Sequence, residues 1–130
     1  MNVNVTSKPL ATVSDLQSEA WLVAESKGFH DGYRGDGRDD TLLRLCLVHT
    51  EVSEAAQEVK RHWPASGSPT DAQRAEFGLE VADAVIRLLD ICGCVGVDLA
   101  RCIRTKMAIN AIRPHRYNTA AEGVSDTETG

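Results

Sequence analysis

The segment that follows Thr70 carries apolar side chains on both sides of a narrow acidic strip, and this pattern constrains the fold more than any other feature. On a helix, one line about 80° wide holds Glu76, Glu80, Asp83, Arg87 and Asp90. One flank carries Phe77, Val81, Ala84, Val85, Leu88 and Cys92, and the other carries Leu79, Ala82, Ile86 and Leu89. A helix that is apolar on both sides of such a strip is buried on both sides. A bundle of 130 residues hardly covers both flanks, so we expect a second subunit to cover one of them.

Capping and turn signals divide the chain into four helical segments with almost no strand signal. Apolar residues recur at helical spacing inside each segment. Gly28 follows the first segment, Gly93 and Gly96 are expected to break the third, and Pro114 follows the fourth. The segments are Ser14–Lys27, opened by a capping box at Ser14–Gln17; Asp40–His62; a segment opened by a capping box at Thr70–Gln73 that continues to about Cys92; and one capped by Asp98 that ends at Arg113. The sequence therefore predicts an all-α, four-helix bundle.

Composition and charge indicate the environment and the partners of this bundle. The formal charge is −5, from 14 Lys+Arg against 19 Asp+Glu, so the basic surface of a nucleic-acid-binding protein is missing. No apolar run approaches the ~20 residues that cross a bilayer, and the first 15 residues have no apolar core of signal-peptide type. We therefore expect a cytoplasmic protein without nucleic-acid or membrane partners. Residues 1–12 are expected to be a flexible N-terminus, 13–117 the folded domain, and 118–130 a disordered tail.

Two further stretches leave alternatives open. The Gly- and Asp-rich segment Phe29–Asp40 fits no P-loop and no EF-hand, and it is either a solvated connection or a lid over a site. The cysteines show no zinc-finger spacing. They are expected to be inert core thiols, with metal or redox use as the alternative; they are Cys46, Cys92, Cys94 and Cys102.

Two acid pairs stand on the second and third segments. Glu51 and Glu54 are three residues apart, as are Glu80 and Asp83, and this spacing points both carboxylates of a pair the same way. Glu51, Glu54 and Glu58 continue the row of Leu43 and Leu47, beside a core stripe expected to contain Leu45, Val48, Val52, Ala55, Ala56 and Val59. If the two helices pack together, four carboxylates meet and raise one another's pKa values unless a cation neutralises them. Such oxygen-rich clusters suit Mg²⁺, or Mn²⁺ as a substitute, and not zinc.

The fourth segment carries a complementary row. Lys106, Asn110 and Arg113 stand at i, i+4 and i+7, on one side of a helix. Beside a metal, this row would hold phosphate oxygens that the ion does not reach. The combination predicts metal-assisted phosphoryl chemistry on a nucleotide.

The order of these motifs resembles a known family. An ExxE at 51–54, a gap of 25 residues and an ExxD at 80–83, followed by a K…N..R helix, is similar to the all-α nucleoside triphosphate pyrophosphohydrolases, and Ser14–Tyr117 looks like their MazG-like branch. The resemblance implies hydrolysis of (deoxy)nucleoside triphosphates to the monophosphate and pyrophosphate, with Mg²⁺ held by the four acids, Glu51, Glu54, Glu80 and Asp83, as the catalytic site. It also implies that Lys106, Asn110 and Arg113 face the triphosphate, that the chain forms a homodimer or homotetramer through a helical interface, and that it serves nucleotide-pool house-cleaning.

Base recognition and the outer residues are less defined by the sequence. Gln17, Trp21 and His30 are candidates for the nucleobase, since an aromatic face and amide groups suit one. Trp21 is otherwise a core anchor, and no histidine has ligand spacing, so His30 has a structural alternative. Arg87 either neutralises the acidic strip or touches phosphate. The competing hypothesis for the whole chain is a regulatory helical oligomer that binds nucleotide or metal without turnover.

Overall fold

The computed structural model describes residues 9–114. In this range the chain forms α1 (Val13–Ser26), α2 (Arg38–His62), α3 (Asp71–Val95) and α4 (Leu99–Ala111), and no strand occurs among these residues. This confirms the predicted all-α class. The predicted domain 13–117 is described as far as Pro114, the predicted tail 118–130 lies outside the described residues, and so do the first eight residues of the predicted N-terminal segment. Between Pro9 and Pro114, no helix is long and apolar enough to cross a membrane.

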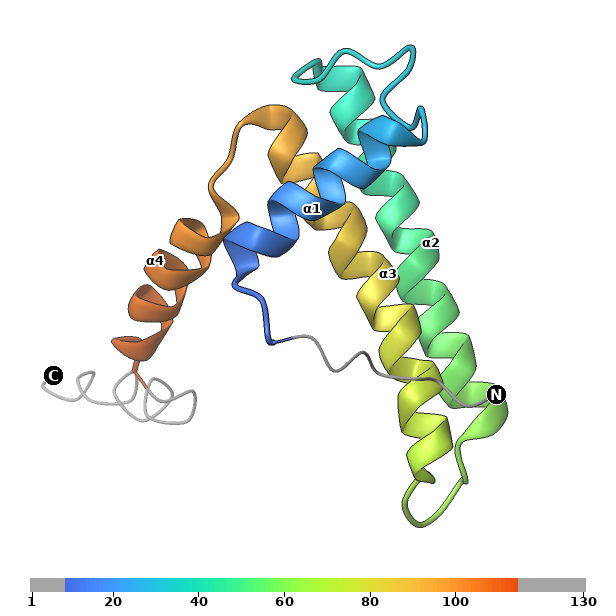
Figure 1. The fold of residues 1–130 in the computed structure, drawn as a ribbon. Helices are drawn as coiled ribbons and strands as arrows, with labels where there is room; N and C mark the ends of the chain where they lie inside the picture. Colours follow the sequence, from blue (N-terminus) through green and yellow to red (C-terminus); the bar gives the residue numbers. More distant parts are fainter. Residues whose placement is uncertain (1–8, 115–130) are drawn as a thin grey trace, which may run out of the picture. The chain divides into compact units, whose positions relative to one another are not determined.

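The described residues divide into two compact units, 9–99 and 100–114. In the first unit, α3 packs against both α2 and α1. Figure 1 shows α2 and α3 side by side along their length, with α1 crossing α3 towards its C-terminal half. The second unit contains α4 from Ala100 onward.

The helix starts follow their caps. At α3 the predicted box is present, because the Thr70 hydroxyl accepts from the Gln73 N–H and the Gln73 side chain accepts from the Thr70 N–H. At α1 the predicted cap is wrong by two residues. The box is formed by Thr12 and Asp15, and Ser14 already lies inside the helix. An acid at the third helical position both accepts a backbone N–H and opposes the positive end of the helix dipole, which favours this start.

The end of α3 also differs from the expectation. Gly93 does not break the helix, which continues to Val95. The helix is instead capped by Gly96, whose φ of +74° is the left-handed conformation of a C-terminal cap. Gly93 has a packing role instead, since a Cβ there would lie 2.9 Å from Cδ1 of Trp21 on α1.

The buried face of α2 agrees only in part with the predicted core stripe, since Val48 and Ala55 are buried as expected. The residues with the least exposure are Arg44, Val48, Glu51 and Ala55, whereas Leu45 is 39% and Val52 is 54% exposed. A core cluster of Val48, Ala84 and Ile91 joins α2 to α3. The helix therefore turns one arginine and one glutamate inward, and the predicted core positions Leu45, Val52 and Ala56 face outward in this unit.

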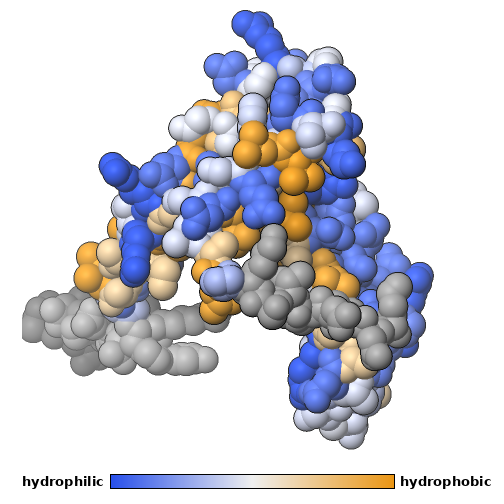
Figure 2. Space-filling model, viewed as in Figure 1, coloured by the Kyte–Doolittle hydropathy of each residue, from blue (hydrophilic) through white to orange (hydrophobic). Residues whose placement is uncertain are grey.

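Apolar side chains also remain open on both flanks of α3. Exposed fractions reach 46% at Leu79, 45% at Val85 and 50% at Ile86. Figure 2 shows apolar side chains at the surface over α1 and α3. A second subunit that covers them stays a prediction.

Candidate functional site

Three of the four predicted carboxylates meet between α2 and α3. Glu51, Glu54 and Glu80 can each place one carboxylate oxygen within 4.8 Å of the others. Glu51 and Glu54 come from successive turns of α2, and Glu80 comes from the facing turn of α3. Glu51 is buried, Glu80 is half-buried and Glu54 is exposed. These three oxygens are the ones that a hard divalent cation would contact.

Asp83 lies outside this group of three but acts on it electrostatically. The pKa of Glu80 is raised above its ordinary value, first because the carboxylate loses hydration, and then because of repulsion from Glu54, Asp83, Glu58 and Glu51, in that order. Repulsion among these carboxylates therefore makes ionisation of Glu80 less favourable than it is for a glutamate in water. We call Glu51, Glu54, Glu80 and Asp83 the acid cluster.

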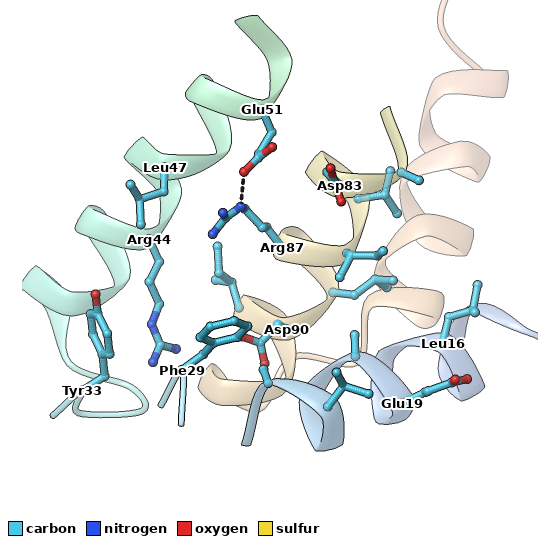
Figure 3. A pocket seen from close by; sticks show the side chains of 18 of the residues that line it. Leu16, Glu19, Phe29, Tyr33, Arg44, Leu47, Glu51, Asp83, Arg87 and Asp90 are labelled. Atoms are coloured by element: carbon cyan, nitrogen blue, oxygen red, sulfur yellow. Dashed lines mark hydrogen bonds and ion pairs between the residues drawn. The ribbon is translucent and has the colours of Figure 1, made fainter. Parts of the chain in front are cut away.

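One arginine partly compensates the acid cluster. Arg87 Nε donates a hydrogen bond to Glu51 Oε1 at 2.5 Å across the α2–α3 interface. The Glu51 side chain is only 10% exposed, whereas that of Arg87 is 49% exposed. Figure 3 shows this pair, with Asp83 on the same stretch of α3 as Arg87. Arg87 pairs here with Glu51 of α2, not with a carboxylate of the acidic strip of α3. Its contact with phosphate stays a prediction.

A wide groove opens beside the acid cluster. It has a volume of about 920 Å³ and is bounded by α1, α2, α3 and the segment between α1 and α2. Glu51, Asp83 and Arg87 contribute to one part of its lining (Figure 3). Most of the remaining lining is apolar and includes Leu16, Val23 and Phe29. The volume lies within the range of small-molecule sites.

A buried arginine in the same groove has no signal in the sequence. Arg44 of α2 is 9% exposed, and its guanidinium carbon stands 4.4 Å from the centre of the Tyr33 ring. Its Nη2 is buried without a hydrogen-bond partner among residues 9–114. An unpaired buried donor of this kind favours an acceptor that enters the groove. The sequence did not predict the burial of Arg44, because it is a charged residue between two apolar residues of the helix, Leu43 and Leu45.

A second polar cluster surrounds His30. Its Nδ1 lies 2.5 Å from Glu25 Oε2 and its Nε2 lies 2.8 Å from Asp90 Oδ1. Cys94 Sγ is 3.4 Å from the same Nε2. Burial lowers the pKa of His30, but the hydrogen bonds and charges of Glu25 and Asp90 outweigh it, so that the pKa is raised overall.

The residues predicted to contact a base have structural partners in this unit. The side-chain amide of Gln17 donates to Val97 O at 2.7 Å and accepts from Leu99 N at 3.2 Å. Trp21 packs on Gly93, and its ring centre lies 5.3 Å from that of His30. Trp21 and His30 both border a smaller cavity of about 370 Å³. Their contact with a base stays a prediction.

The predicted phosphate-binding residues belong to the second unit. Lys106 and Asn110 lie on α4, and Arg113 follows it, where its N–H donates to Asn110 O. All three are exposed. Their role towards phosphate stays a prediction.

Comparisons with protein-family models, with curated proteins and with solved structures find no match for this chain.

Proposed function

We propose that the chain is a Mg²⁺-dependent hydrolase that converts (deoxy)nucleoside triphosphates to the monophosphate and pyrophosphate. The observation that carries the proposal is the meeting of Glu51, Glu54 and Glu80 from two helices within 4.8 Å, at the edge of a groove. The order of acid pairs in the sequence, which resembles the MazG-like pyrophosphohydrolases, supports the same activity. Clearance of surplus or non-canonical nucleotides is the role we propose for it.

The donor set of the acid cluster fits a hard divalent ion. All of its ligand atoms are carboxylate oxygens, which Mg²⁺ and Mn²⁺ favour over zinc. The raised pKa of Glu80 means that a cation at this place would relieve repulsion. Glu51, Glu54 and Glu80 would hold the ion, with Asp83 at its border. When bound, Mg²⁺ polarises phosphate oxygens and neutralises the charge of the leaving pyrophosphate.

The groove supplies room and a cation for the rest of a nucleotide. Its volume of about 920 Å³ is sufficient for a base, a sugar and a phosphate chain. The apolar part of the lining would exclude water from the base. Arg87, half-exposed next to Glu51, can exchange its carboxylate partner for a phosphate oxygen, since a guanidinium binds both in the same geometry. A carboxylate of the cluster that the ion does not fully occupy would accept the proton of the attacking water.

Assembly belongs to the same proposal. Exposed aliphatic residues remain on α3, including Leu79, Val85 and Ile86. Leu79 directly precedes Glu80 and Ile86 directly precedes Arg87, so two of these residues adjoin the acidic strip. A homodimer or homotetramer that covers these residues would also shield the acid cluster from water.

The test is a pyrophosphate-release screen of the full chain over canonical and modified nucleoside triphosphates, with Mg²⁺ and with chelator. We expect release that requires Mg²⁺ and falls at least 100-fold in Glu54→Gln and in Asp83→Asn, since loss of an essential acid or metal ligand has effects of this order. Glu76→Gln is the matched control. It removes one acid from the same helix, one turn before Glu80 and outside the group of three, and should retain activity.

The outcomes separate the enzyme from its alternative. Nucleotide binding without product, in Mg²⁺ and across the whole screen, would refute hydrolysis and favour the regulatory oligomer. Equal loss in Glu76→Gln and Glu54→Gln would show that overall acidity, and not the acid cluster, is what matters.

A further inference from the structure

The side chains around His30 have the composition and the arrangement of a transition-metal site. They come from three places in the first unit: Glu25 at the end of α1, His30 in the following segment, and Asp90 with Cys94 on α3. The spacing of Asp90 and Cys94 by four residues places both on one face of α3. A histidine nitrogen, a carboxylate oxygen and a thiol sulfur can all lie within 4.8 Å of one another here.

The separations are close to those of metal ligands. Zinc binds nitrogen at about 2.0–2.1 Å, carboxylate oxygen at about 2.0–2.2 Å and sulfur at about 2.3 Å, so the edges of a tetrahedral site measure about 3.4–3.6 Å. The Nε2 of His30 stands 2.8 Å from Asp90 Oδ1 and 3.4 Å from Cys94 Sγ. Sγ and Oδ1 are 3.9 Å apart. Small rotations of the Asp90 and Cys94 side chains would bring all three to one ion.

Glu25 supplies the supporting contact that such sites use. Its carboxylate lies 2.5 Å from Nδ1 of His30, which holds a proton on that nitrogen. The other nitrogen, Nε2, is then the one that faces Asp90 and Cys94. Metal-bound histidines almost always donate their second N–H to a carboxylate, carbonyl or water, which fixes the ring and raises its basicity.

The neighbouring packing holds the ring in place. The Trp21 ring lies against His30, with centres 5.3 Å apart, and Trp21 in turn fits against the backbone of Gly93, next to Cys94. The His30 side chain is only 12% exposed. A preorganised ligand loses little conformational freedom when it binds.

A cavity gives an ion access from solvent. It measures about 370 Å³ and is bordered by Glu25, His30 and Cys94, and also by Trp21. A metal held by His30, Asp90 and Cys94 would therefore retain an open position towards the cavity, as zinc sites with three protein ligands do.

We propose that His30, Asp90 and Cys94 form a binding site for a divalent transition-metal ion of the zinc class, with Glu25 orienting the histidine. The site is separate from the acid cluster and does not depend on the proposed hydrolase activity. Thiolate and imidazole ligands select zinc, cobalt or nickel over magnesium. The thiol releases its proton when the ion binds, and His30, whose Nδ1 proton stays with Glu25, releases a proton from Nε2 only from its doubly protonated form.

The test is a titration of the full chain, stripped with chelator and kept reduced, with Co²⁺. We expect one equivalent per chain to give the near-ultraviolet thiolate-to-cobalt charge-transfer band, and Zn²⁺ but not Mg²⁺ to displace it. Cys94→Ser should abolish the band. Cys46→Ser is the matched control, since Cys46 is an exposed cysteine of α2 outside this cluster, and should keep it.

A second variant tests the orienting contact. Glu25→Gln should keep the band and weaken Zn²⁺ binding by about 10- to 100-fold, which is the usual effect of removing such a partner. Absence of the band in the unaltered chain at millimolar Co²⁺ would overturn the site, and so would a band that Cys94→Ser retains. Helical circular dichroism of each variant distinguishes a lost ligand from a lost fold, and the parent titration decides the question if a variant does not fold.

Discussion

The pair between Arg87 and Glu51 gives the sharpest test of how the acid cluster is held together. Arg87→Met removes the guanidinium and keeps a long apolar stem in the groove. Glu51, whose side chain is 10% exposed, then loses the cation that contacts it at 2.5 Å. The other carboxylates of the acid cluster remain, so Glu51 faces only like charge.

The expected loss of stability follows from burial on one side of the pair. A hydrogen bond to a charged group contributes about 1.5–3 kcal/mol. Because 49% of the Arg87 side chain is exposed, solvent screens part of this, and we expect Arg87→Met to lower the free energy of unfolding by about 1–2 kcal/mol. In a domain of about 100 residues this corresponds to a fall in Tm of about 4–16 °C.

Arg74→Met is the matched control. Arg74 lies on the same helix, is 53% exposed and pairs with Asp71 at 3.0 Å, but the Asp71 side chain is fully exposed. Its loss should cost less than about 0.5 kcal/mol. Urea denaturation of both variants in chelator, at one protein concentration, measures the difference. Mg²⁺ should stabilise Arg87→Met more than it stabilises the parent, because the ion replaces the missing cation. Equal destabilisation by the two substitutions, or an unchanged response to Mg²⁺, would refute this reasoning.

Three further perturbations test other parts of the first unit. Gly93→Ala places a Cβ 2.9 Å from Trp21 Cδ1, so a packing cost of about 1–3 kcal/mol opposes its helix-propensity gain of about 1 kcal/mol. Gly78→Ala meets open space and should receive that gain in full, so equal urea midpoints for the two variants would contradict the close contact. The raised pKa of Glu80 means that its ionised carboxylate opposes folding at any pH above the pKa that Glu80 has in the unfolded chain. Glu80→Gln in chelator should therefore raise Tm at pH 7, and the difference should fade towards pH 4.5. A lower Tm at pH 7 would show that repulsion is absent. The raised pKa of His30 means that protonated His30 stabilises the metal-free protein most below pH 6.5, and that this contribution is lost as the pH rises through the pKa of His30 in the folded state. His30→Gln should therefore destabilise more at pH 6 than at pH 9. A pH-independent loss in thermal scans would assign the effect to packing alone.

The helices were predictable because their signals are local. The Thr70–Gln73 box and the turn after His62 define the α2–α3 hairpin. The hairpin in turn places the acid pair of α2 opposite that of α3. The start of α1 was misplaced because Ser14 and Gln17 also have the form of a capping box. In the fold, the Gln17 amide instead binds the backbone at Val97 and Leu99, a contact 80 residues away in sequence that no local pattern reveals.

The candidate site was predictable in part for the same reason. Spacing by three residues indicates that Glu51 and Glu54 share a face, but it does not indicate that α2 turns Arg44 and Glu51 inward while Leu45 and Val52 stay exposed. Hydrophobic periodicity assigns burial by residue type, whereas the buried face of α2 also carries Glu51, which pairs with Arg87, and Arg44, which lies over the Tyr33 ring.

The cluster around His30 had no local signal at all. His30 precedes Asp90 by 60 residues and Cys94 by 64, and the neighbouring Cys92 and Cys94 form a CxC without the second ligand pair of a zinc finger. Only the crossing of α1 over α3 brings them together. Gly93, predicted as a helix breaker, is what permits this close crossing.

The two polar clusters can be studied separately because α3 separates them. Glu80 and Asp90 are ten residues apart on one helix, which is about 15 Å along its axis, beyond the ~8–10 Å over which charges act through physiological salt. One cluster offers only carboxylate oxygens, and the other offers nitrogen, oxygen and sulfur, so their preferred ions differ. Among residues 9–114, the one cation paired with the acid cluster is Arg87, which contacts Glu51, and the pKa of Glu80 stays raised. Repulsion of this kind lowers stability without a ligand, and this cost supports the proposed role of the acid cluster in binding a cation.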